Sequence, residues 1–157
     1  MQMLKILKDS EGRHDVFLSF GAIAFEHIES WMRSASLIIP PDLVEFWSQT
    51  GGGDLFDDSE TLLRPTRIPS IYPNFIEGDD VESATQFRIQ NGLPNLYLPF
   101  HVGTCFSALR LADQMFVTLG DRFQETGVFP TFDEWYVRTL RPIYAEQYGL
   151  PNEDVEV

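Results

Sequence analysis

The sequence predicts an α+β fold in a single domain, with a mainly antiparallel central sheet and helices packed against it. Two observations lead to this prediction. Apolar residues recur at helical spacing toward both ends of the chain, and two β-rich runs follow one another in its second half. The chain has 157 residues, of which 43% are hydrophobic, so it can bury one substantial core. No repeat, low-complexity run or linker divides residues 1–157.

The N-terminal part predicts a short strand followed by a helix. Residues 1–20 are expected to form an N-terminal extension or an edge strand, with the strand itself near Val16. A helix should follow between Gly21 and about Ser34. Within it Phe25, together with the apolar residues three and seven positions later, recurs at helical spacing and predicts a buried stripe.

The most informative stretch is IIPPDLVEFWSQTGGGDLF, at residues 38–56, which predicts a second helix. Pro41 suits the first helical position, because its missing N–H would have no partner there. Phe46 and Trp47 fall on one apolar face and are predicted to be core. The glycines at 51–53 can adopt the positive φ that ends a helix and turns the chain back.

The region after the glycines predicts two short strands and then irregular structure. Leu55 and Leu62 begin the two strands, and an acidic turn at residues 57–60 joins them. Three prolines between residues 65 and 73 exclude a long regular element, because each lacks an N–H donor and restricts the residue before it. Residues 80–90 predict a turn or two of helix.

The second half predicts the centre of the sheet. Alternating apolar residues from Leu96 to Phe100 predict a strand, and residues 104–111 and 115–119 predict an antiparallel hairpin. The apolar residues of this hairpin occur on both faces. We therefore expect it to be central and covered by helices on at least one side.

The last helix has the clearest start signal, a capping box formed by Thr131 and Glu134. Pro142 should end or kink this helix near Leu140, because its ring clashes with the carbonyl four residues earlier. Residues beyond it predict one short further turn, and the acidic tail at 151–157 is expected to fray.

Three segments, in this order, resemble the SUKH superfamily, which includes yeast cell-wall regulators and bacterial toxin-immunity proteins. IPPDL, FW and GGG within residues 39–53 look like its helix with an aromatic face and a glycine end. LPF followed by Gly103 looks like its "lpF…G" approach to the central strands, and PTFDEW at residues 130–135 looks like the "sFeeFl" start of its last helix. The chain departs from the family in having three glycines for Asn-Gly, and in the segment before Gly21.

The resemblance implies a function in binding without catalysis. Its bacterial members imply an immunity protein that occupies a toxin domain and blocks it. Its fungal members imply the alternative, an intracellular scaffold or regulator in cell-envelope or stress signalling. The family binds varied toxins through varied surfaces, so the resemblance implies no particular contact residue.

The net charge of −13 limits the classes of partner. Nucleic-acid binding requires a cationic patch, and the chain has only 11 Lys and Arg residues against 24 Asp and Glu, so we predict no nucleic-acid partner. An acidic protein attracts basic partners by long-range steering, although acidity also serves solubility alone. The single cysteine fits a reducing compartment, and no apolar run has the length of a signal peptide or membrane helix. We predict a cytoplasmic protein without a membrane partner.

No recognisable motif for catalysis, metal or cofactor binding is present. The histidines, His14, His27 and His101, lack metal-ligand spacing with Cys105. The glycines at 51–53 follow a helix and precede acidic residues, unlike a phosphate-binding loop. We predict that the chain is not an enzyme, with no catalytic residue, metal or cofactor. A small hydrolase is a third hypothesis, and it would need a cleft in which His101 or Cys105 meets a carboxylate.

The acidic clusters are instead predicted to be a surface that meets a basic toxin domain. Adjacent loop carboxylates do not predict the separation across a cleft that a pair of catalytic acids needs. Two aromatic residues on the proline-rich loop are candidate anchors for the partner. The predicted contact residues are Asp57, Asp58, Glu60, Tyr72, Phe75, Asp79, Asp80 and Glu82. The oligomeric state does not follow from the sequence.

Overall fold

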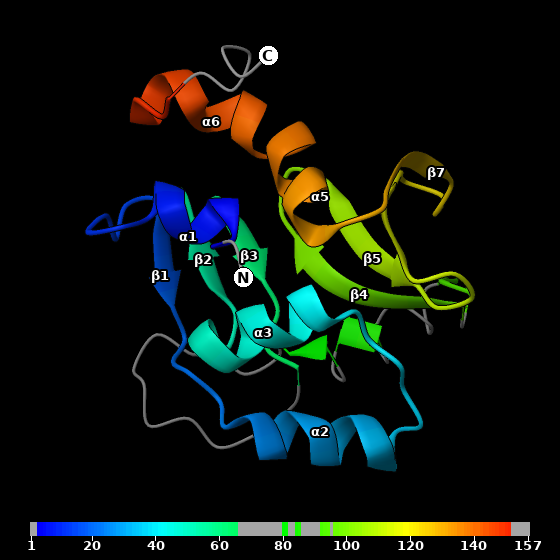
Figure 1. The fold of residues 1–157 in the computed structure, drawn as a ribbon. Coiled ribbons are helices and arrows are strands. Elements are labelled where there is room, and N and C mark those ends of the chain that lie inside the picture. The colour runs from blue at the N-terminus through cyan, green and yellow to red at the C-terminus, as the bar shows by residue number, and fades with distance from the viewer. Residues whose placement is uncertain (1–2, 66–79, 82–83, 86–91, 95, 152–157) are drawn as a thin grey trace.

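A seven-stranded antiparallel sheet runs through the molecule, and each strand pairs with the next one in the sequence (Figure 1). The computed structural model describes residues 3–65, 80–81, 84–85, 92–94 and 96–151. The strands are β1 (Phe17–Ser19), β2 (Gly53–Leu55), β3 (Glu60–Leu62), β4 (Tyr97–Val102), β5 (Phe106–Arg110), β6 (Met115–Leu119) and β7 (Glu125–Phe129). The helices in the described part of the chain are α1 (Lys5–Asp9), α2 (Phe25–Ser34), α3 (Pro41–Thr50), α5 (Phe132–Arg138) and α6 (Arg141–Tyr148). The α+β fold predicted from the sequence is confirmed.

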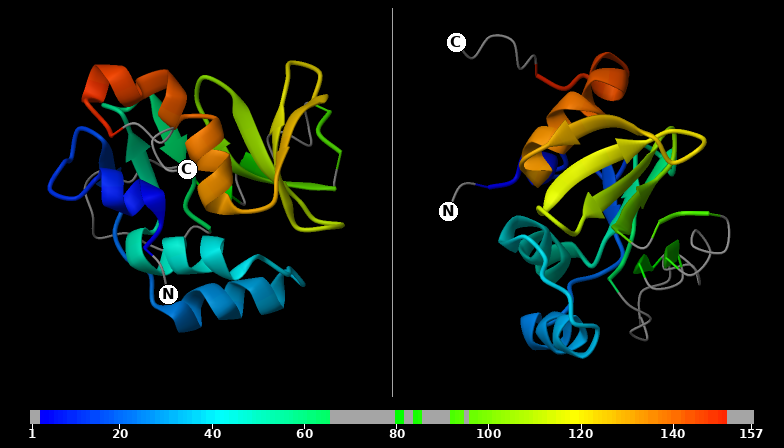
Figure 2. Two further views of the ribbon diagram at one scale, coloured as in Figure 1. Left: turned by 45° about the horizontal axis from the view of Figure 1, so that its top comes forward. Right: turned by 90° about the vertical axis from the view of Figure 1, so that its right-hand side faces the viewer.

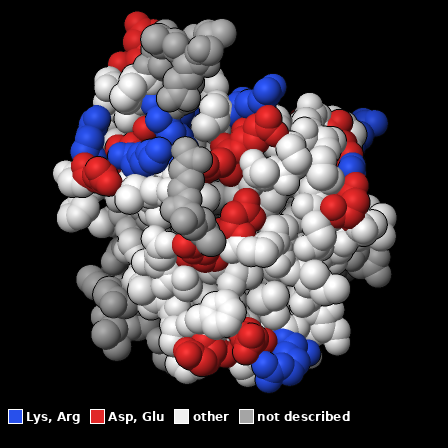
Figure 3. Space-filling model, viewed as in Figure 1, with Lys and Arg blue, Asp and Glu red and all other residues white. Residues whose placement is uncertain are grey.

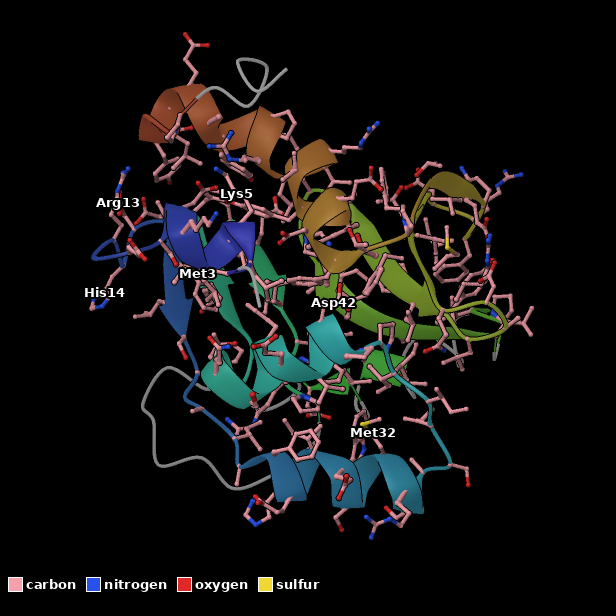
Figure 4. All side chains as sticks on the ribbon, in the orientation of Figure 1. Met3, Lys5, Arg13, His14, Met32 and Asp42 are labelled. Atoms are coloured by element: carbon pink, nitrogen blue, oxygen red, sulfur yellow. The ribbon has the colours of Figure 1, made fainter. Side chains whose placement is uncertain are left out.

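Helices α1, α3 and α5 cover one face of the sheet, and α2 lies outside α3 (Figures 1 and 2). α5 packs against β6 and β7, while α6 continues from α5 toward the end of the sheet where β2 turns into β3. Asp42 connects α3 with α5, because its Oδ2 accepts a hydrogen bond from the Phe132 backbone N–H at 2.9 Å (Figure 4). This hydrogen bond places the start of α3 beside the start of α5.

The main core lies between the helical layer and the sheet and is rich in aromatic side chains. Phe46 of α3 packs against Phe132 of α5 with ring centroids 5.0 Å apart, and Phe100 of β4 packs edge-on against Trp135 at 4.8 Å. Trp47 is buried, and its indole N–H donates to the Leu63 carbonyl at 2.9 Å. The prediction that Phe46 and Trp47 belong to the core is therefore confirmed.

The opposite face of the β5–β6 hairpin carries a smaller apolar cluster. Phe106, Ala108 and Val117 are buried there, with Phe123 packed against them. Side chains that alternate along a strand point to opposite faces, so Phe106 and Ala108 lie on this face while Leu109 joins the main core. Both strands of the hairpin have a neighbouring strand on each side, and α5 packs on β6, so the hairpin is internal to the sheet and covered by a helix on one face.

The turn after α3 uses its glycines in two different ways. Gly51 and Gly52 have φ of 69° and 85°, in the left-handed region, and they end the helix as predicted. Gly53 has no positive φ and is the first residue of β2. A Cβ there would lie 2.4 Å from the Leu18 carbonyl oxygen, so close approach of the backbone of β1 requires glycine.

Several boundaries differ from the predicted ones. α2 begins at Phe25 rather than Gly21, and the Phe25 side chain is 52% exposed instead of lying in a buried stripe. Phe25 occupies the first turn of an outer helix, which packs on α3. α1 and β7 were not predicted, because α1 spans only five residues and β7 contains a glycine and alternates without a buried face. Pro142 lies in the first turn of α6, so the helix is interrupted between α5 and α6, as expected.

No helix in the described part of the chain is long and apolar enough to cross a membrane.

Candidate functional site

A buried carboxylate lies beneath the turn that joins β2 and β3. Glu60 is the first residue of β3 and is 1% exposed. Its carboxylate accepts hydrogen bonds from His101 Nε2 at 2.8 Å, from the Thr104 N–H at 3.0 Å and from the Tyr144 hydroxyl at 2.6 Å. The Thr104 hydroxyl donates to the same carboxylate. Donors from β4, the β4–β5 turn and α6 therefore converge on one acidic side chain.

The hydrogen bonds around His101 define its tautomer. Nε2 faces Glu60, which only accepts, so Nε2 carries the proton. Nδ1 lies 3.0 Å from the Ser107 hydroxyl, which donates to it and in turn accepts from the Trp135 indole N–H at 3.0 Å. This relay runs from Trp135 through Ser107 and His101 to Glu60, and each of its polar atoms has a partner.

Burial and hydrogen bonding act in opposite directions on the two titratable groups. Burial lowers the pKa of His101, although its bond to Glu60 partly opposes this, and His101 is neutral at pH 7. Burial by itself would raise the pKa of Glu60. The hydrogen bonds from His101, Thr104 and Tyr144 outweigh it and hold the Glu60 pKa below its usual value. Glu60 therefore remains a buried negative charge.

Ser107, His101 and Glu60 are the residue types of a hydrolytic triad, but their placement does not serve one. A nucleophilic serine must reach a substrate, and both Ser107 and His101 have 0% of their surface exposed. The hydrogen bonds of His101 go to Glu60 and Ser107, and none of them involves Cys105. Cys105 Sγ lies 3.9 Å from Ser107 Oγ, and burial raises the Cys105 pKa, which disfavours a reactive thiolate. The chemistry available to this group is hydrogen bonding within the fold.

The turn above Glu60 is acidic and has an unusual backbone. Phe56, Asp57 and Asp58 have φ of 52°, 55° and 69°, so three consecutive residues other than glycine adopt the left-handed conformation. Each such residue is unfavourable by roughly 1 kcal/mol, and surrounding contacts must hold it in place. These contacts come from the helix α6 and from the chain before β1.

α6 supports the turn through two tyrosines one helical turn apart. The buried ring of Phe56 stacks on Tyr144 with centroids 4.2 Å apart and an interplanar angle of 16°. The Tyr148 hydroxyl donates to Asp57 Oδ2 at 2.8 Å, and this bond raises the pKa of Tyr148 to about 12. The two tyrosines therefore hold both the ring and one carboxylate of the turn.

The segment before β1 supports the turn from the other side. The backbone N–H groups of Phe56 and Asp57 donate to the carbonyls of Val16 and Asp15 at 2.9 and 3.0 Å. Arg13, labelled in Figure 4, pairs with Asp15 at 2.8 Å and also donates to the Tyr148 carbonyl at 2.6 Å. The acidic turn is thus connected to both ends of the chain.

The carboxylates of Asp54 and Asp58 lie close together and make the turn strongly negative. Burial raises the pKa of Asp54, and the nearby carboxylate of Asp58 raises it further, against a hydrogen bond from Thr61. Among the described residues, no Lys or Arg forms an ion pair with Asp57 or Asp58. Asp57 and Asp58 are exposed, so the turn presents two carboxylates to solvent.

The structure separates the predicted contact residues into three groups. Asp57 and Asp58 lie side by side on the exposed turn. Glu60 and Asp80 are buried, at 1% and 0% exposure, so the expectation that they belong to the charged surface is wrong. Glu60 pairs with Leu55 in the sheet and turns its side chain inward. The backbone of Asp80 forms an isolated parallel β-bridge with that of Arg64. The remaining four predicted contacts, Tyr72, Phe75, Asp79 and Glu82, lie outside the described residues.

The residues that hold the turn, above all Tyr144 and Tyr148, were not predicted from the sequence. Their spacing of four residues after a proline was a usable signal, because it places both rings on one face of a helix. Nothing in the local sequence indicates that this face meets residues 56–57.

In the described ranges, no group of three His, Cys, Asp or Glu side chains is arranged to hold a metal ion. A scan against protein-family models found no match to the chain, and a search of curated proteins found none either. The resemblance to the SUKH superfamily stays a prediction.

Proposed function

We propose that this chain is a non-catalytic protein-binding domain, an immunity protein that neutralises a basic toxin domain by binding it directly. The observation that carries the proposal is the acidic turn, at which Asp57 and Asp58 are exposed on a backbone held in one conformation. A surface that is already ordered loses little conformational entropy when it binds. Ser107, His101 and Glu60, which have the residue types of an active site, lie below the turn and are buried.

Charge supports the same proposal. The exposed carboxylates of Asp57 and Asp58 lie above Glu60, whose buried charge has only neutral hydrogen-bond partners among the described residues. With a net charge of −13 on the whole chain, such a surface attracts a cationic partner over a distance of about a Debye length. Toxin domains that act on nucleic acid are basic, and an acidic turn can occupy the groove that binds phosphates.

The three segments that resemble the SUKH superfamily support the assignment to the immunity class and to a bacterial, cytoplasmic setting. The alternative within the same resemblance is an intracellular scaffold or regulator with a basic partner. Binding, rather than chemistry, is common to both.

The first experiment is a binding assay with the C-terminal domain encoded by the gene immediately upstream as bait. A 1:1 complex that silences the toxicity of the bait is the expected result. Failure to bind that domain, in a strain that tolerates loss of this chain beside an active toxin, would favour the scaffold instead.

The contribution of the turn is tested by association kinetics with the same bait. The double variant Asp57→Asn/Asp58→Asn keeps a residue that tolerates positive φ and removes two charges, so it should associate roughly tenfold more slowly at low salt. The matched control Asp113→Asn/Asp121→Asn removes two exposed charges from the β5–β6 and β6–β7 turns. Equal slowing by both double variants, or a rate that does not depend on salt, would refute steering by the turn.

A further inference from the structure

A second surface lies on the opposite end of the molecule from the acidic turn, between α2 and α3 (Figure 1). The two helices run side by side and enclose a groove of about 420 Å³. Phe25, Glu29 and Met32 line it from α2, at positions i, i+4 and i+7. Pro41, Val44, Glu45 and Ser48 line it from α3, at positions i, i+3, i+4 and i+7. The groove therefore follows about two turns of each helix.

The floor of the groove is apolar and partly open to solvent. Ile39 and Val44 are buried below it, and Met32 projects from α2 toward α3 (Figure 4). Phe25 is 52% exposed at one end and adds its ring to the apolar lining of the groove. Met is adaptable in shape and is common on surfaces that accept varied apolar partners.

Carboxylates flank this apolar floor on both sides. Glu29 stands on α2, where it pairs with Arg33 at 3.2 Å, and Glu45 stands on α3, where it accepts a bond from Gln49. Together α2 and α3 carry four acidic residues and one basic residue. Figure 3 views this face and shows an uncharged area between acidic side chains along α2 and others above it.

Among the described residues, α2 packs on α3 through the buried Ile28 and an edge-on contact of Trp31 with Trp47 at 5.8 Å. These contacts hold the two walls of the groove beside one another.

We propose that the α2–α3 groove binds an amphipathic basic helix of the protein partner. Apolar side chains of that helix, spaced over about two turns, would enter between Phe25, Met32 and Val44, as in other helix-in-groove complexes. Its Lys and Arg residues would face Glu29 and Glu45. This inference rests on the proposed function in one respect, because it takes the partner to be a basic protein.

The test uses the purified full chain and a synthetic probe, the peptide Ac-KLAKLAKKLAKLAK-NH₂, with no toxin present. Two control peptides accompany it: one in which every Lys is replaced by Glu, and a scrambled one of the same composition. Amide chemical shifts of the ¹⁵N-labelled chain report both the site and the affinity. We expect saturable shifts within α2 and α3 for the basic amphipathic peptide, and weaker binding of both controls.

Point variants then separate the apolar and the charged contribution. Phe25→Ala should weaken binding about fivefold, because it removes apolar contact at the mouth of the groove. Its matched control is Ile143→Ala on α6, since Ile143 is also 52% exposed, and this variant should bind normally. Glu45→Gln should weaken binding about twofold at low salt and less at high salt. Neither Phe25 nor Ile143 is part of the buried core, so both variants should keep the fold.

Four outcomes would overturn the proposal. These are no saturable binding up to about 1 mM peptide, shifts confined to residues outside α2 and α3, equal binding of the Glu-containing peptide, or groove shifts that depend on the concentration of the chain alone. The last would assign the groove to contact between two copies of this chain. Because the titration contains no toxin domain, the groove can fail while the immunity complex still forms, and the two failures are distinguishable.

Discussion

Two buried carboxylates in this molecule are compensated in different ways. Asp9 of α1 faces the Arg141 guanidinium, with Nε 2.8 Å from Oδ2, and also accepts a bond from the Tyr136 hydroxyl at 2.7 Å. Glu60 of β3 is held by neutral donors, among them a histidine whose pKa is lowered by burial. Asp9 is therefore neutralised by a full positive charge, whereas Glu60 keeps its negative charge and distributes it over hydrogen bonds.

The difference corresponds to the positions of the two groups. The Asp9–Arg141 pair joins α1 to the start of α6, and neither of its residues belongs to the acidic turn. The Glu60 group lies directly below Asp57 and Asp58 and adds its charge to theirs. A carboxylate held by neutral donors stabilises the turn and at the same time strengthens the negative potential above it.

The largest effect is expected from breaking the ion pair. Arg141→Met leaves buried Asp9 with only the more distant Lys5 ammonium, 3.9 Å away, as a cation among the described residues, and should lower the free energy of unfolding by about 3 kcal/mol. Asp9→Leu/Arg141→Met removes both charges and should recover most of this loss, because no buried charge remains unpaired. Urea unfolding of the two variants measures the difference. A single variant within about 1 kcal/mol of the wild type would show that the pair does not hold α1 in place.

A smaller loss is expected from neutralising Glu60. In Glu60→Gln the amide NH₂ would face groups that now donate to the carboxylate, so at least one donor loses its acceptor, at a cost of about 2 to 3 kcal/mol. Asp54→Asn is the matched control one strand away. Because burial raises the Asp54 pKa, loss of its charge should change the free energy of unfolding by less than about 1 kcal/mol. Equal losses from the two variants would mean that the network below the turn has no special role.

The Glu60 network should also respond to pH. The pKa of folded His101 lies below its usual 6.5, so the unfolded chain takes up this proton first. Its contribution to stability is complete above about pH 6.5 and is lost as pH falls through the folded pKa. Glu60 has a lowered pKa too, so its contribution is present above about pH 4.5 and is lost at lower pH.

We therefore expect the free energy of unfolding to fall between about pH 7 and about pH 5. His101→Gln should flatten the curve in this window and leave the decline below about pH 4.5 in place. Unfolding by urea at a series of pH values provides the measurement. A wild-type curve that is flat between these two pH values would contradict the assignment of His101 as neutral and buried.

The smallest effects concern the two tyrosines of α6. Tyr144→Phe keeps the stack on Phe56 and removes one hydrogen bond to Glu60, with an expected loss of about 1 kcal/mol. Tyr148→Phe removes a bond to the exposed Asp57, where water replaces the hydroxyl, so the loss should be smaller. Thermal unfolding of both variants decides the order. The reverse order would mean that the turn depends on its outer contact rather than on Glu60.

Much of the fold follows from local patterns in the sequence. Three local signals define α3 with the observed bounds: Pro41, the apolar face with Phe46 and Trp47, and Gly51. Each signal acts within a few residues. The Thr131 side chain accepts the bond from the Glu134 N–H at 3.1 Å, as half of the predicted capping box. Elements without such signals, α1 and β7, were missed.

The candidate site was predictable only in part. Asp57 and Asp58 were recognised because an acidic run between two apolar segments predicts an exposed turn. Glu60 belongs to the same run, yet the register of β3 against β2 places it opposite Leu55 with its side chain inward. A shift of one residue along a strand reverses the face of the side chain, and no local pattern in the run distinguishes the two registers.

The sequence by itself determined the class of the fold, the helix α3, the central hairpin and the acidic character of the molecule, because periodicity, caps and net charge depend only on neighbouring residues or on composition. Only the tertiary structure decided which acids face solvent and which are buried. The donors that keep Glu60 charged come from residues 101, 104 and 144, which are distant in the sequence, and the groove beside Phe25 exists only where α2 meets α3. Contacts between segments so far apart are set by how the whole core packs, and for that reason they cannot be inferred one segment at a time.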